Sequence, residues 1–252
     1  MTAFSERELL AAYSYPDQDP LLVDVGAHQG GFALPFARRG WRVLALEPEP
    51  QNLAACRRNL APFPRARCLE RTIADRPQQG VTFYVSREHY GIHSLRPFHA
   101  THRPAFTVDT TTLDQVLAEQ GVERVTLLKI DIEGADYLAL QGLDLKRYQP
   151  RVVMTEFMDE RSQPHFGYTH HHMVEHMAAW GYQALVSEWA PIKAYARQGE
   201  KGEPHQWLRC RPYPLDHQPA WGNLIFLPRE EMPRFQGFLD SYLRSRGLGE
   251  AP

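Results

Sequence analysis

The sequence is poor in cysteine, and it contains neither a long apolar run nor a Cys-x-x-Cys pair. Its three cysteines, Cys56, Cys68 and Cys210, predict neither a disulfide framework nor a cysteine zinc site, so reduced thiols are expected. No apolar run approaches the roughly 20 residues of a membrane-spanning helix, and the first residues lack the basic and apolar segments of a signal peptide. We therefore expect a cytoplasmic protein without a membrane partner.

An excess of charge of either sign is also missing. The chain of 252 residues carries 28 basic and 30 acidic side chains, for a formal net charge of −2. A protein that coats nucleic acid needs a concentrated basic face, so this balance argues against a nucleic-acid partner. Hydrophobic residues make up 43% of the chain, which is enough for one sizeable core. Proline and histidine are plentiful instead, with 20 and 12 residues.

Short apolar segments alternate with segments of helical spacing along most of the chain. The apolar segments predict strands at 21–25, 42–46, 66–73, 125–131, 151–157, 182–186 and 223–227. The other segments predict helices at 30–39, 50–60, 112–120, 134–140, 169–180 and 231–246. This alternation predicts an α/β fold with a mostly parallel, seven-stranded sheet and helices on both faces. Residues 81–85 and 105–110 predict an accessory pair of strands.

A single domain is expected to account for the whole chain, residues 1–252, with its core at about 20–228. Residues 190–222 are rich in proline and aromatic residues but show little periodicity. They predict an irregular insertion between two strands, either a functional cap or a surface excursion. The helix at 231–246 follows the last strand, and the sequence does not determine the oligomeric state.

The strongest local motif lies between the first strand and the first helix, and it reads Asp24-Val25-Gly26-Ala27-His28-Gln29-Gly30. Glycine there allows a sharp turn and a close approach of the backbone to a ligand. The spacing differs from the Gly-x-Gly-x-x-Gly that binds a dinucleotide pyrophosphate, and Asp24 would repel a phosphate but suit an ammonium or sulfonium group. The motif predicts a cationic, amino-acid-like cofactor that contacts Asp24, Gly26, Ala27, His28 and Gly30.

Polar residues at the ends of the second and third strands predict a nucleoside site. Glu47, followed by Pro48, can accept hydrogen bonds from both hydroxyls of a ribose, as found with NAD and with S-adenosylmethionine. After the third strand, Ile73, Ala74 and Asp75 offer an apolar wall and a polar cap for an adenine ring.

Asp131 ends the fourth strand, within the segment Leu128-Lys129-Ile130-Asp131-Ile132-Glu133-Gly134. Strand alternation puts Asp131 and Lys129 on one face, and the carboxyl ends of parallel strands line the ligand crevice. We therefore expect Asp131 to point toward the group that Gly26 and Glu47 hold. Alternatively, Asp131 caps the next helix, although Glu133 can also serve as the cap.

Several of these segments form a pattern that extends to the end of the last strand. They are Asp24-Val25-Gly26-Ala27-x-x-Gly30, Glu47-Pro48, Thr112-Leu113-Asp114, the stretch from Leu128 to Asp136, and Asn223-Leu224-Ile225-Phe226-Leu227-Pro228. In this pattern, from about residue 20 to 228, the chain resembles the FkbM-type S-adenosylmethionine-dependent methyltransferases. The segment 128–134 is its most specific part. The chain departs from the family pattern at His28, His93 and Asp136.

The resemblance implies the Rossmann-like methyltransferase fold, which is a doubly wound, seven-stranded sheet with an antiparallel last strand. It also implies S-adenosylmethionine as the cofactor. Members of the family mostly methylate hydroxyl groups, often on sugars or secondary metabolites, and some act on nitrogen. We therefore expect a small-molecule or glycan acceptor.

Methyl transfer to a hydroxyl needs alignment of donor and acceptor, and it benefits from a base near the acceptor proton. Asp131 is the first candidate for that base by its position. His93 and Glu156 are further candidates, as acid-base or hydrogen-bonding groups on the acceptor side.

A metal site is not favoured by the sequence. His172 and His176 lie one helical turn apart and would suit zinc, whereas Asp131, Glu156 and Asp159 would suit magnesium. No complete ligand set such as His-Glu-x-x-His appears, so we expect the histidines between 165 and 176 to line a polar cleft or a helix surface. Metal assistance to acceptor deprotonation stays an open hypothesis.

Other functional classes are less favoured. An NAD-dependent oxidoreductase would be expected to carry Gly-x-Gly-x-x-Gly, and Asp24 would oppose its pyrophosphate. In a cofactor-binding module without catalysis, Asp131 would only cap a helix. A nucleic-acid methyltransferase is disfavoured because no Asn-Pro-Pro-aromatic or Asp-Pro-Pro-aromatic segment follows the fourth strand and the chain has no basic tail.

Overall fold

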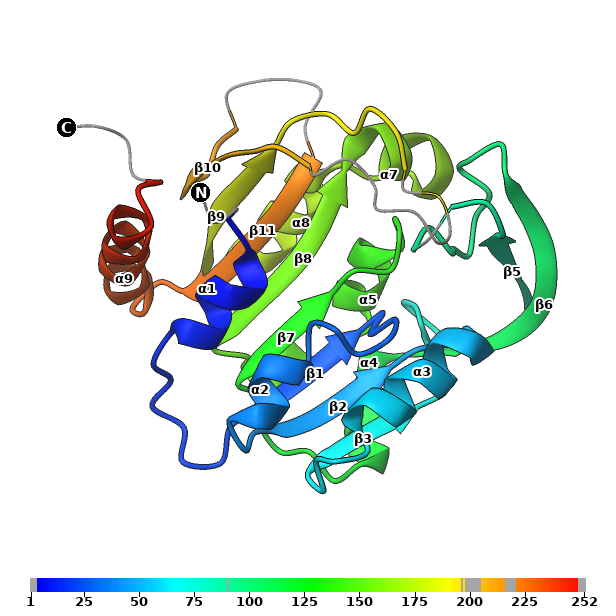
Figure 1. Cartoon of the computed structure of the whole chain (residues 1–252), viewed down its shortest axis with the longest axis horizontal. Coiled ribbons are helices and arrows are strands. Elements are labelled where there is room, and N and C mark those ends of the chain that lie inside the picture. Colours follow the sequence, from blue (N-terminus) through cyan, green and yellow to red (C-terminus); the bar gives the residue numbers. More distant parts are fainter. Residues whose placement is uncertain (1–3, 90, 196, 198–204, 216–220, 249–252) are drawn as a thin grey trace.

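A computed structural model describes residues 4–89, 91–195, 197, 205–215 and 221–248 (Figure 1). Its centre is an eight-stranded sheet in the order β10-β9-β11-β8-β7-β1-β2-β3. The strands are β1 (Leu21–Val25), β2 (Arg42–Leu46), β3 (Ala66–Leu69), β7 (Leu127–Ile130), β8 (Val152–Met158), β9 (Tyr182–Trp189), β10 (Trp207–Pro212) and β11 (Trp221–Pro228). The neighbouring strands β3, β2, β1, β7 and β8 are all parallel to one another. β11 pairs antiparallel with both β8 and β9.

The predicted sheet is confirmed except for its strand count, which is eight rather than seven. The extra strand, β10, lies inside residues 190–222, so the prediction of an irregular insertion is wrong for Trp207–Pro212. β10 pairs antiparallel with β9 at the edge of the sheet. An edge strand is covered less than a central one, so it lacks the continuous apolar pattern that identifies buried strands. Leu208 is one of the exposed large apolar residues of the molecule.

Helices cover both faces of the sheet, as Figure 1 shows. The first face carries α1 (Glu6–Ala12), α2 (Leu34–Arg38), α3 (Pro50–Leu60) and α9 (Met232–Ser245). The opposite face carries α4 (Leu113–Glu119), α5 (Asp136–Gln141), α6 (Leu145–Tyr148) and α8 (His170–Ala178). Every residue of β1 and β7 is buried, because strands between two helical layers meet apolar side chains on both sides. No helix among the described residues is long and apolar enough to cross a membrane.

A second sheet of three strands stands beside the main one. It consists of β4 (Thr72–Ile73), β6 (His102–Thr111) and β5 (Gln78–Ser86), in that order. The antiparallel pairing of β5 with β6 confirms the predicted accessory pair. The predicted strand at 66–73 is wrong as one element, because the chain leaves the main sheet after Leu69 and joins the second sheet at Thr72.

Short helices are the elements that the sequence pattern missed. α1, α6 and α7 (Asp159–Phe166) have four to eight residues, too few to show several turns of apolar spacing. α2 begins at Leu34 rather than at residue 30, because the chain forms turns before Pro35 enters the first helical turn. The predicted helix at 231–246 is confirmed within one residue at each end.

Candidate functional site

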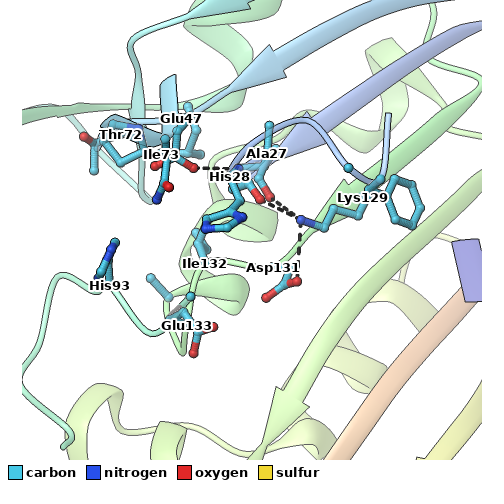
Figure 2. A pocket seen from close by; sticks show the side chains of 18 of the residues that line it. Ala27, His28, Glu47, Thr72, Ile73, His93, Lys129, Asp131, Ile132 and Glu133 are labelled. Carbon is cyan, nitrogen blue, oxygen red and sulfur yellow. Dashed lines mark hydrogen bonds and ion pairs between the residues drawn. The ribbon is translucent and has the colours of Figure 1, made fainter. Parts of the chain in front are cut away.

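A cavity of about 600 Å³ opens at the carboxyl ends of β1, β2 and β7. Figure 2 shows Thr72, Ile73 and His93 on one side of it and Lys129 and Asp131 on the other. The cavity lies where the strand order reverses, which is the usual ligand position in an open α/β sheet. Seven predicted site residues line it: Gly26, Ala27, His28, Glu47, Pro48, His93 and Asp131.

Gly26 lets the end of β1 come very close to the end of β7. Its φ is +75°, and a Cβ at this position would lie 1.9 Å from the carbonyl oxygen of Asp131. The N–H groups of Gly26 and Ala27 both donate to the carbonyl oxygen of Leu46, at 3.0 Å each. The turn is therefore bonded to β2 on one side and packed against β7 on the other, and only glycine fits it.

Glu47 joins the end of β2 to the turn after β1. Its Oε2 accepts the His28 N–H at 2.8 Å, and its Oε1 accepts the Glu49 N–H at 2.9 Å. Burial raises the pKa of the Glu47 carboxyl to about 7, although both N–H groups favour its ionised form. The carboxyl group of Glu47 lines the cavity with a fixed orientation.

Lys129 is buried between two carboxylates. Its Nζ lies 3.2 Å from Asp24 Oδ1 and 3.5 Å from Asp131 Oδ2, and it donates to the carbonyl oxygen of Gly26 at 2.8 Å. Burial disfavours the ammonium, but Asp24 and Asp131 outweigh it and raise the pKa of Lys129 above its usual value. Lys129 therefore stays charged and holds both carboxylates.

Asp24 does not line the cavity, which corrects the predicted direct contact with a cationic cofactor. Its side chain is fully buried behind the cavity, and the ammonium of Lys129 occupies the position expected for the ligand. Burial raises the pKa of the Asp24 carboxyl, and Lys129 opposes that shift.

Three more predicted contact residues lie outside the cavity lining. A Cβ on Gly30 would meet Cys56 Sγ at 3.2 Å, so this glycine serves the packing of the turn against α3. Ala74 is buried, and the carboxylate of Asp75 pairs with Arg76 at 3.7 Å. Of the three residues predicted at the adenine, only Ile73 lines the cavity, and Thr72 and Phe83 complete its wall in place of Ala74 and Asp75, because the chain changes sheets just before Thr72.

Glu156 is paired inside the protein and does not line the cavity. The buried guanidinium of Arg161 lies between it and Glu133, with Nη1 2.7 Å from Glu156 Oε2 and 2.5 Å from Glu133 Oε2. Burial raises the pKa of both carboxyls, and Arg161 opposes the shift. Carboxylate oxygens of Asp131, Glu133 and Glu156 lie within 4.8 Å of one another, but two of the three already share a cation.

His93 faces the cavity as a neutral ring. Its Nδ1 accepts the Ser86 N–H at 3.4 Å, which leaves the proton of the neutral imidazole on Nε2. Burial lowers the pKa of His93, and burial lowers the pKa of His28 to about 4. At neutral pH His93 is therefore a hydrogen-bond donor at Nε2, which makes it a poor base there.

Asp131 lines the cavity and does not cap the following helix. α5 begins at Asp136 with Ala135 as its N-cap. The buried Asp136 carboxylate shapes the segment between them by accepting the N–H groups of Ile132 at 3.2 Å and Gly134 at 3.0 Å.

The model of the methyltransferase FkbM domain family matches residues 24–184. The chain belongs to the FkbM methyltransferase family. This confirms the family resemblance of its sequence motifs. Among curated proteins, the FkbM-family chain is 25% identical over 174 residues to the 2-O-methyltransferase NoeI of Sinorhizobium fredii, a match that covers 61% of this chain and 69% of NoeI.

Solved structures resemble this FkbM-family chain only distantly. The TehB-like SAM-dependent methyltransferase of Corynebacterium glutamicum has a TM-score of 0.46 and 13% identity, over 89% of this chain and 87% of its own. The precorrin-6y C5,15-methyltransferase of Geobacter metallireducens has a TM-score of 0.44 and 14% identity, over 88% and 87%.

The start of α1 is a further part of the FkbM-family site, and no sequence motif predicts it. Ser5, Glu6 and Arg7 line the cavity together with Asn223 at the start of β11. Asn223 Nδ2 donates a hydrogen bond to Glu6 Oε1, although the two residues are 217 positions apart in the sequence. Strand alternation predicts Lys129 on the face of Asp131, but it does not predict the ion pairs of Lys129 with Asp24 and Asp131.

The histidines between 165 and 176 lie away from the cavity. His170 Nδ1 is 2.6 Å from Asp159 Oδ2, and the rings of His172 and His176 pack near Tyr137. Within the described ranges, histidines form no group of three ligands that could hold a metal ion.

The predicted cap at 190–222 falls partly on residues 196, 198–204 and 216–220, which lie outside the described residues. None of its described residues lines the cavity.

Proposed function

We propose that this protein is an S-adenosylmethionine-dependent methyltransferase that methylates a hydroxyl group of a sugar, glycan or secondary metabolite. The observation that carries the proposal is the meeting of the Gly26 turn, Glu47 and Asp131 in one cavity. The relative that is named a 2-O-methyltransferase supports oxygen as the accepting atom.

The cavity fits the cofactor in size and in chemistry. Its volume of about 600 Å³ suits a ligand of this size, since pockets for small molecules measure roughly 300–1,000 Å³. The Glu47 carboxylate is held by two N–H groups and keeps lone pairs for the two ribose hydroxyls. Thr72, Ile73 and Phe83 offer a largely apolar wall for the adenine.

S-adenosylmethionine, when bound, supplies an electrophilic methyl group on a positively charged sulfonium. Asp131 would accept a hydrogen bond from the acceptor hydroxyl and would take its proton while the methyl carbon–sulfur bond breaks and the carbon–oxygen bond forms, with S-adenosylhomocysteine as the other product. Lys129, 3.5 Å from the Asp131 carboxylate, holds it in place. His93 donates from Nε2 to an oxygen of the acceptor and orients it, which is a binding role rather than that of a base.

The proposal is tested with isotopically labelled S-adenosylmethionine. The purified protein is incubated with it and with a pool of sugars, glycans and cell-extract metabolites, and the labelled product is identified by mass spectrometry. Label on a hydroxyl oxygen is the expected result. Label on nitrogen would overturn the choice of acceptor atom. Thermal stabilisation by NAD and none by S-adenosylhomocysteine would overturn the cofactor.

We also propose that the reaction does not depend on a divalent metal. Arg161 lies between Glu133 and Glu156, so a cation at these carboxylates would have to displace a buried guanidinium. We expect dialysis against a chelator to change the turnover rate by less than about twofold, within the usual error of a comparison of rates. A loss of activity that magnesium, manganese or zinc restores would contradict this.

A further inference from the structure

Glu6 is a buried acidic residue in the lining of the cavity. It is 7% exposed, although it lines the cavity beside Ser5 and Arg7. Its Oε1 accepts hydrogen bonds from Ser187 Oγ at 2.7 Å, Trp189 Nε1 at 2.7 Å and Asn223 Nδ2 at 3.0 Å. Three donors from β9 and β11 therefore fix the orientation of this carboxylate.

The second oxygen of Glu6 has no partner among the described residues. Within the described part of the chain, Oε2 accepts no hydrogen bond and Glu6 forms no ion pair. Moving a carboxylate out of water costs free energy, and hydrogen bonds from neutral donors offset only part of that cost. A cationic group on a ligand would offset that cost.

The other acidic side chains of the cavity already form ion pairs or accept backbone hydrogen bonds at both carboxylate oxygens. Asp131 pairs with Lys129, and Glu133 pairs with Arg161. Glu47 accepts two backbone N–H groups and stands at the end of β2. Glu6 is the acidic residue of the lining best placed to receive a positive charge.

The strand order places Glu6 and Glu47 at opposite ends of the cavity. Glu47 ends β2, whereas Glu6 contacts β9 and β11, and the strands β1, β7 and β8 separate these two sides. A ligand with its ribose at Glu47 therefore extends across β1 and β7 toward α1. The far end of S-adenosylmethionine is an amino acid, with one ammonium and one carboxylate.

We propose that Glu6 and Arg7 form the subsite for this zwitterionic end of the cofactor. The inference rests on the proposed function. Glu6 Oε2 accepts a hydrogen bond from the ammonium. Arg7 attracts the carboxylate, and its Nη1 is held 3.3 Å from the carbonyl oxygen of Gly31, beside the turn that follows β1. Because Arg7 is exposed, its contribution is the smaller of the two.

The test compares two ligands that share a nucleoside and differ at the far end. S-adenosylhomocysteine carries the amino acid, and 5′-methylthioadenosine lacks it. Dissociation constants are measured by calorimetry on the full chain. For Glu6→Gln we expect about a tenfold weaker binding of S-adenosylhomocysteine, typical of a lost charge-assisted hydrogen bond, and unchanged binding of 5′-methylthioadenosine. For Arg7→Gln we expect about a threefold weakening with the first ligand only.

Glu8→Gln is the matched control, because Glu8 lies on the same helix and pairs with Arg246 outside the cavity lining. It should bind both ligands as the wild type does. If Glu6→Gln does not fold, Glu6→Asp keeps the charge and should weaken only the binding of S-adenosylhomocysteine.

Two outcomes would overturn the inference while leaving the proposed function intact. Equal weakening of both ligands would mean that Glu6 only maintains the shape of the cavity. Unchanged binding of both would mean that Glu6 does not meet the cofactor. If the wild type binds neither ligand, the proposed function itself fails.

Discussion

Asp24 and Asp131 share one lysine but differ in what else surrounds them. The Asp24 side chain is fully buried, whereas that of Asp131 is 40% exposed at the cavity. Lys129 neutralises the first carboxylate behind the cavity and holds the second in front of it. The two acids that the sequence assigned to the same site therefore have different surroundings: Asp24 contacts Lys129 away from the cavity lining, and Asp131 faces the cavity.

Asp131→Asn tests the proposed role of Asp131 as the base. We expect the turnover rate to fall at least about a hundredfold, because a positioned base contributes roughly 10²–10⁴ to such a step. The affinity for S-adenosylhomocysteine and the melting temperature should stay near the wild-type values. Asp75→Asn, outside the cavity lining, is the control. Full turnover by Asp131→Asn would remove Asp131 from the mechanism.

Glu47 predicts a pH dependence of cofactor binding. Its pKa is raised to about 7, so a large part of the free protein carries a neutral Glu47 at neutral pH. Ribose hydroxyls are better bound by the ionised carboxylate, so binding favours loss of the proton. We expect the affinity for S-adenosylhomocysteine to rise by about tenfold from pH 6 to pH 8, the range across this pKa. Calorimetry should find weaker and pH-independent binding for Glu47→Gln, and the same slope in both proteins would refute the assignment.

At the scale of elements, the turn between β1 and α2 depends on the close approach at Gly26. Gly26 and Gly40 have φ values of +75° and +80°, but only Gly26 has backbone atoms where a Cβ would lie. Gly40→Ala should cost about 1 kcal/mol of unfolding free energy, from conformational strain alone. Gly26→Ala should cost at least about 2 kcal/mol more, from overpacking, and should abolish cofactor binding. Chemical denaturation measures the unfolding free energies of the two variants. An equal loss in Gly26→Ala and Gly40→Ala would contradict the prediction.

The elements differ in how far the sequence predicted them. The central strands and the long helices α3, α8 and α9 were predicted because their apolar periodicity reflects burial between two layers. The edge strand β10 was missed because a strand at the edge of a sheet need not be apolar throughout. The break between β3 and β4 was missed because only Glu70 and Arg71 separate the two short strands, and no glycine or proline marks the point where the chain changes sheets.

At the scale of the whole molecule, buried acids make stability depend on pH. Burial raises the pKa of Asp136 from 3.8 to about 7. Between these values the folded protein holds a proton that the unfolded chain releases, so the contribution of Asp136 to the unfolding free energy falls as pH rises. The advantage of the wild type over Asp136→Asn should therefore shrink by about 3 kcal/mol between pH 5 and pH 8. Chemical denaturation of both proteins between pH 5 and pH 8 measures the difference in their unfolding free energies. A difference that does not change with pH would contradict the prediction.

The sequence by itself determined the strand ends that carry the site, the need for glycine at residue 26 and the family of the chain. Those features depend on neighbours along the chain, where periodicity, turn geometry and motif spacing act. Only the tertiary structure decided which charge meets which: Lys129 with Asp24, Arg161 with Glu133 and Glu156, and Glu6 with the donors of β9 and β11. The partner of a buried charge is set by contacts between distant segments, and local sequence patterns do not encode these contacts.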